Sequence, residues 1–158
     1  PRRPILVPEA FHPSLQFRYM VTTSKLPGAN FYARSAQQPT AQHNPVTVEY
    51  INSYFKVKGK TRWDDITLQC YQFEGITSQQ LWQYLQQHQA TDVAVDSYAP
   101  QYKHDLKIMS VSPLETPIQT WTLVGAFYTS VAWGDMDRGT DDVTQATVTI
   151  SYDYAILT

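Results

Sequence analysis

The spacing of apolar and polar residues predicts a chain built mainly from β-strands. The segment 146–157 shows this most clearly, because every second residue from Ala146 to Ile156 is apolar or aromatic. Strict alternation is typical of a strand with one buried and one exposed face. By the same criterion, strands are expected at 14–23, 30–36, 46–58, 63–73, 102–112, 120–133 and 146–157. The chain therefore has about seven predicted strands.

Glycine and proline mark where these strands reverse direction. Pro27 and Gly28 lie between the first two segments and predict a hairpin that pairs them. Residues 58–61, with the sequence Lys-Gly-Lys-Thr, interrupt a long β-prone stretch. They predict the turn of a long protruding hairpin between the third and fourth segments. Gly125 falls inside a predicted strand and indicates a bulge or a close approach of two backbones.

Two segments do not follow the strand pattern. Residues 76–89 place Leu81, Trp82 and Leu85 on one side of a helix, which predicts a single helix packed on the sheet. Residues 1–13 contain four prolines, and proline lacks the backbone donor that helices and central strands require. We expect this proline-rich segment to be an extended arm.

The composition indicates one globular domain with an unusually uncharged surface. The chain has 158 residues, of which 42% are hydrophobic and only 16% are charged, and its formal net charge is −2. We expect a single domain over 1–158, an antiparallel β-barrel or sandwich of about seven strands with one packed helix. The charge argues against bulk attraction to nucleic acid, and the uncharged polar surface suits subunit packing. No apolar run reaches 18 residues, so no membrane anchor is expected.

The sequence contains no arrangement of residues typical of an enzyme. Asp64 and Asp65 are adjacent on a predicted strand, so they point to opposite faces and are disfavoured as a catalytic pair. Cys70 is expected in the core, with no nearby histidine to activate it. Residues 134–142 superficially resemble a calcium loop but lack its third ligand and distal Glu, so an acidic hairpin loop is the default interpretation. The four histidines lack metal-binding spacing. We therefore predict no catalytic residue, no metal and no cofactor.

The order of the elements resembles a known family, the tail tube proteins of contractile-tailed bacteriophages. The resemblance rests on the opening strands, the central stretch VKGKTRWDDITLQCY, the helical LWQYL, the strand YKHDLKIMSVS and the closing TVTISYDY. It covers roughly residues 14–156. Each motif is loose by itself, and their order and spacing carry the similarity.

The resemblance implies a structural subunit of a phage tail tube. In that family hexameric rings stack into a hollow tube, with subunit sheets joined into a continuous β-barrel around the channel. A sheath protein surrounds the tube, a baseplate and a tail terminator occupy its ends, and DNA passes through the lumen during genome ejection. The expected location is the virion, after assembly in the host cytoplasm.

The resemblance also implies roles for particular residues. The family's extended hairpin loop, which contacts neighbouring subunits and the adjacent ring, matches Lys56, Val57, Lys58, Gly59, Lys60, Thr61, Arg62 and Trp63. Because cations gather there, we expect an acidic partner surface at Asp135, Asp137, Asp141 and Asp142. A lumen through which DNA slides should be polar and not basic. The candidate lining is Thr147, Thr149, Ser151 and Asp153, or the polar face of 46–58.

Other functions remain open at this point. Within assembly, the chain could be a baseplate protein that initiates the tube, or a tube of a secretion-type injection system. In a different class, it could be a monomeric β-barrel that binds a hydrophobic ligand or a glycan through its 11 tyrosines.

Overall fold

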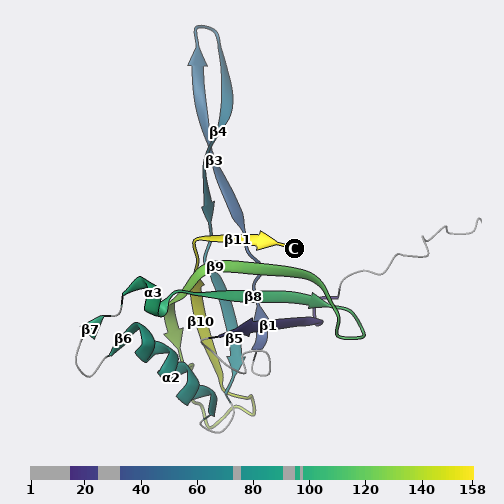
Figure 1. Ribbon diagram of the computed structural model, residues 1–158, viewed down its shortest axis with the longest axis vertical. Coiled ribbons are helices and arrows are strands. Elements are labelled where there is room, and N and C mark those ends of the chain that lie inside the picture. Colours follow the sequence, from purple (N-terminus) through teal and green to yellow (C-terminus); the bar gives the residue numbers. More distant parts are fainter. Residues whose placement is uncertain (1–14, 25–32, 73–75, 91–94, 97) are drawn as a thin grey trace, which may run out of the picture.

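The computed structural model describes residues 15–24, 33–72, 76–90, 95–96 and 98–158, and it is mainly β as the alternation predicts (Figure 1). Seven strands form one antiparallel sheet in the order β1-β8-β9-β10-β5-β2, and β11 pairs with β9. These strands are β1 (Tyr19–Thr23), β2 (Ala33–Ala36), β5 (Ile66–Tyr71), β8 (His104–Val111), β9 (Pro117–Ala132), β10 (Gln145–Ser151) and β11 (Tyr154–Leu157). The arm expected at 1–13 lies outside the described residues.

Strand β9 joins the two halves of the sheet, one formed with β1, β8 and β11 and the other with β10, β5 and β2. Its first part, around Trp121 to Val124, pairs with β8 on one side and β11 on the other. Its last part, from Phe127 to Ala132, pairs with β10. Gly125 lies between these parts, with a positive φ of +68° and a shift in register against β8. The bulge predicted at Gly125 is confirmed, and it lets one long strand serve both halves.

The core lies between the two halves of the sheet. Alternate residues of β5 and β10 are almost completely buried, and they meet buried residues of β1, β8 and β9. The largest fully buried side chains are Ile66, Leu68, Leu81, Leu106, Leu123, Val21, Val148 and Cys70. Burial of Cys70 agrees with its predicted place in the core.

The predicted helix is present as α2 (Ile76–His88). Leu81 is fully buried, but Tyr84 takes the second core position, and Trp82 is half-exposed beside Trp133. The Tyr84 hydroxyl lies 3.3 Å from His104 Nε2, and the Tyr128 hydroxyl donates to the Leu85 carbonyl. The helix therefore packs through a tyrosine layer, because the hydroxyls of these rings can meet polar groups inside the core.

Short elements fill the segment between the helix and β8. Gln89–Ala90 (β6) pairs with Val95–Asp96 (β7), and a four-residue helix, α3, covers Ala99–Tyr102. None of the helices in the described part of the chain has the length and apolar character needed to cross a membrane.

The structure corrects one predicted strand pairing and one predicted continuous strand. Among the described residues, β1 pairs with β8 and β2 pairs with β5, instead of with each other as a hairpin. The segment 146–157 is also not a single strand, because the chain bends at Tyr152 and Asp153 and continues as β11. The alternation holds through Tyr152, which is buried, and then fails, since Tyr154 and Ile156 are exposed.

Candidate assembly surfaces

The most prominent surface is a two-stranded hairpin that projects from the body of the protein (Figure 1). It consists of β3 (Ala41–Tyr50) and β4 (Ser53–Trp63), joined by a tight turn at Ile51 and Asn52. The turn predicted at 58–61 is wrong, because these residues lie inside β4. Strand β3 begins at Ala41, five residues before the start of the strand predicted at 46–58.

The outer half of the hairpin has one apolar and one polar face. Residues directly opposite each other in an antiparallel pair point to the same side. Val46 pairs with Val57 and Val48 pairs with Phe55, which gives an apolar face. On the other side lie the pairs Pro45 with Lys58, Thr47 with Lys56 and Glu49 with Tyr54. All of these side chains are exposed in the single chain.

Such a hairpin needs a partner. An isolated two-stranded ribbon is marginally stable at best in water. Here the outer half of the ribbon, residues 45–58, buries neither face against the described part of the chain. An exposed apolar face rimmed by polar residues marks a protein-protein contact.

The eight residues matched to the family's hairpin loop do not act as one loop. Trp63, at the base of β4, packs on the core, with its ring 6.0 Å from that of Tyr152. Gly59 lies at a bulge, where a side chain would clash with the carbonyl oxygen of Asn44. The remaining residues, Lys56, Val57, Lys58, Lys60, Thr61 and Arg62, extend along the hairpin. Within the described residues, none of the four cations makes an ion pair.

The four predicted acidic residues lie together in the exposed loop between β9 and β10. Asp137 is held in place by hydrogen bonds from the Gly139 amide at 2.9 Å and the Thr140 hydroxyl at 3.1 Å. The hydrogen bond from the Gly139 backbone is the main reason that the pKa of Asp137 is lowered. Asp135, Asp141 and Asp142 share the loop. Among the residues that the structure describes, no group of three or more ligand side chains could hold a metal ion.

The candidate lumen residues do not share one strand. Thr147, Thr149 and Ser151 lie on β10, with their side chains on the face opposite the core. Asp153 lies at the bend between β10 and β11, and its carboxylate pairs with the Lys103 ammonium at 3.0 Å. The polar face of β10 continues onto the neighbouring strand β5, because Gln69 and Thr67 of β5 pair with Thr147 and Thr149. Ser130 of β9 stands opposite Thr149 on the other side.

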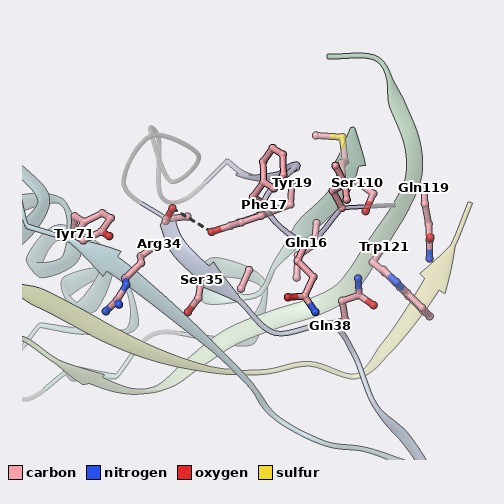
Figure 2. A pocket seen from close by; sticks show the side chains of 15 residues that line it. Gln16, Phe17, Tyr19, Arg34, Ser35, Gln38, Tyr71, Ser110, Gln119 and Trp121 are labelled. Atoms are coloured by element: carbon pink, nitrogen blue, oxygen red, sulfur yellow. Dashed lines mark hydrogen bonds between the residues drawn. The ribbon is translucent and has the colours of Figure 1, made fainter. Parts of the chain in front are cut away.

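A groove between β1 and β2 is a surface that the sequence pattern does not predict (Figure 2). It has a volume of about 910 Å³. Phe17 and Tyr19 line one wall, and Arg34 lines the other. The Tyr19 hydroxyl donates to the Ala33 carbonyl at 3.2 Å. The sequence pattern predicts that the segments of β1 and β2 pair directly as a hairpin. Such a pairing would leave no groove between them.

Similarity to known proteins agrees with this architecture. Residues 15–156 match the family described as T4-like virus tail tube protein gp19. The chain belongs to that family. A comparison with curated protein sequences gives no match.

Solved structures of contractile injection systems have the same fold as this tail tube family member. The tube-terminating cap of the anti-feeding prophage is 19% identical, with a TM-score of 0.76 over 94% of this chain and 92% of that chain. The sheath-tube complex of an extracellular contractile injection system, PVC, gives 20% identity and a TM-score of 0.75, covering 94% and 93%. Hcp1 from Flavobacterium johnsoniae is 12% identical, with a TM-score of 0.51, covering 89% and 94%.

Proposed function

We propose that this chain is the main structural subunit of a phage tail tube. Six copies form a ring, rings stack into a hollow tube, and the viral genome passes through it during ejection. The subunit has a mechanical role and carries out no catalysis. The tube is part of the virion and is assembled in the host cytoplasm.

The observation that carries this proposal is the β3–β4 hairpin. Its apolar face, formed by Val46, Val48, Phe55 and Val57, is exposed in the single chain. Other copies of the same chain supply the surface that a ribbon of this kind requires. The family match over 15–156 supports the tube as the form of that assembly.

The partners follow from the systems that share the fold. The solved relatives include a tube-terminating cap and a complex of sheath with tube. By analogy, we propose a sheath protein outside this tube, with a baseplate at one end and a terminator at the other.

The polar face of β10 and β5 is the proposed lumen lining. Thr147 and Thr149 stand beside Gln69 and Thr67 in a neutral patch of hydroxyl and amide groups. A nucleic acid gains most of its affinity from cationic side chains that bind phosphate. A neutral wall therefore lets DNA pass without being held. Asp153 is left out of this lining because it pairs with Lys103.

The test is negative-stain electron microscopy of the purified protein at rising concentration, with light scattering in parallel. Rings or hollow tubes of uniform width and sixfold symmetry are the expected result. If the protein remains monomeric at every concentration, including in the presence of preformed tube ends as nuclei, the proposal is wrong.

A further inference from the structure

The turn of the β3–β4 hairpin has a conformation that is costly for its own sequence. Ile51 has a φ of +24°, which β-branched residues rarely adopt. Two-residue hairpin turns with a positive φ at the first central position favour glycine there. Strain of this kind persists at sites where a side chain serves a contact.

The same turn exposes large apolar side chains to water. Ile51 is 89% exposed and the neighbouring Tyr50 is 68% exposed. Neither side chain stabilises the turn by burial. We call Tyr50 and Ile51 the tip. An apolar tip that is both strained and exposed is explained by a contact with another molecule.

The groove between β1 and β2 has the features that would accept this tip. Its volume of about 910 Å³ is of the size that holds a drug-sized ligand, so it has room for two side chains. Its walls include Leu15, Tyr19 and Trp121, and Phe17 is 72% exposed at its edge. Burying Phe17 against the tip would remove two exposed apolar surfaces from water at once.

The groove and the hairpin also carry opposite charges close to the proposed contact. Among the described residues that line the groove, Arg34 is the charged one. Its guanidinium donates to Gln145 Oε1 at 2.6 Å, which holds it at the wall. Glu49 directly precedes the tip and is the only carboxylate on the two hairpin strands. A tip seated in the groove would bring these opposite charges to the same wall.

We propose that the tip of one copy inserts into the β1–β2 groove of a second copy. The hairpin projects away from the body that carries the groove, so one chain does not satisfy its own groove (Figure 1). A contact between two different surfaces of identical chains is head-to-tail, and it repeats into a ring or a filament. The inference rests on the proposed tube function and assigns one contact within that assembly.

The first test replaces Ile51 with glycine. Glycine suits the backbone of the turn, so Ile51→Gly keeps the hairpin folded but removes the apolar group. We expect the concentration needed for assembly to rise about tenfold or more, as for loss of a buried anchor residue. The matched control is Leu114→Gly, which changes an equally exposed apolar residue in the β8–β9 turn and should leave assembly unchanged. Equal assembly of Ile51→Gly and the wild type would overturn the inference.

The second test asks whether the tip meets this particular groove. Glu49→Arg and Arg34→Glu should each weaken assembly, and the double variant should recover most of the wild-type behaviour. Recovery is expected only if the two charges face each other across the contact. A double variant that assembles no better than either single variant would show that the tip binds elsewhere.

These outcomes separate the contact from the function. A wild-type protein that forms tubes together with an unaffected Ile51→Gly refutes only the assigned contact. A wild-type protein that forms no multimer under any of these conditions refutes both.

Discussion

At the scale of single residues, Gly125 controls the path of the longest strand. Its φ of +68° is unfavourable for other residues, and a side chain there would clash with Asp153 Oδ2. Asp153 in turn pairs with Lys103. One glycine therefore allows both the bend of β9 and the close approach of the corner between β10 and β11.

We predict that Gly125→Ala destabilises the folded subunit. The positive φ and the clash together should lower the free energy of unfolding by about 1–3 kcal/mol. Urea unfolding followed by tryptophan fluorescence measures this change. Gly139→Ala is the matched control, because the added atom meets Asp137 only at an ordinary contact distance, from 3.5 Å. An equal effect of both variants would contradict the argument.

Cys70 provides a second prediction at this scale. Burial raises the pKa of its thiol from 9.0 to about 11. Between these values the unfolded chain loses the thiol proton while the folded chain keeps it. The free energy of unfolding therefore falls as the pH rises from about 9 to about 11, and this contribution is fully retained at lower pH. Burial also raises the pKa of Tyr84, which acts in the same direction at higher pH.

A thiol-specific reagent checks the state of Cys70. At pH 8 we expect the native thiol to react at least about a hundredfold more slowly than the thiol in denaturant, because burial hinders both ionisation and access. Similar rates in the two conditions would show that the strand β5 opens readily.

At the scale of elements, the β3–β4 hairpin separates two kinds of surface. Its apolar face lies on one side of the ribbon, and Lys56, Lys58 and Glu49 lie on the other. The two faces alternate residue by residue, so adjacent positions can be compared directly. Phe55 belongs to the apolar face and Tyr54 to the polar face, and they are 55% and 69% exposed.

We predict that Phe55→Lys prevents tube assembly while Tyr54→Lys is tolerated. Lysine on the apolar face would place a charge in an apolar contact between copies, whereas lysine on the polar face joins side chains that already carry charge, such as Lys56 and Lys58. Both variants should keep the stability of the single chain within about 0.5 kcal/mol, because both side chains are exposed. Electron microscopy and chemical unfolding measure the two effects separately. Loss of tubes in both variants would contradict the prediction, because assembly would then not distinguish the two faces.

At the scale of the whole molecule, opposite charges lie on separate surfaces. Lys56, Lys58, Lys60 and Arg62 lie along the hairpin, and the acidic residues lie in the loop between β9 and β10. None of these cations pairs with a described residue of its own chain. We propose that they meet the acidic loop of a neighbouring subunit across the junction between rings.

We predict that Lys58→Glu combined with Lys60→Glu shortens the tubes and makes them more sensitive to salt. Reversing two charges turns attraction into repulsion at each junction, and salt screens what attraction remains. Tube length in electron micrographs across a salt series measures the effect. Lys107→Glu, at an exposed position of β8, is the control. Unchanged tube length and salt resistance in the double variant would rule out this junction.

Much of the secondary structure could be predicted from the sequence. The strands around β5, β8, β9 and β10 follow from alternation, and α2 follows from its helical spacing. Alternation works here because each of these strands has one face on the core. The predicted apolar side of the helix was correct at Leu81 but did not include Tyr84. A buried tyrosine depends on a hydrogen-bonding partner for its hydroxyl, here His104, which helical spacing does not reveal.

The hairpin turn shows where such prediction stops. The glycine signal at 58–61 was real, but it marks a bulge at which Gly59 admits the Asn44 carbonyl. The true turn, at Ile51 and Asn52, has no glycine and interrupts a uniform β-prone run. Asn52 and Ser53 favour turns, but the β-prone residues on both sides outweigh this weak local signal.

The sequence by itself determined the β-rich class, the longer helix α2, the buried face of most strands and the resemblance to tail tube proteins. These depend on periodicity and on the order of elements along the chain, which are local properties. Only the tertiary structure decided that β1 joins β8, that β2 joins β5 and that a groove lies between them. Pairing brings together residues far apart in the chain, and many alternatives bury the same apolar faces, so packing of the whole core selects among them.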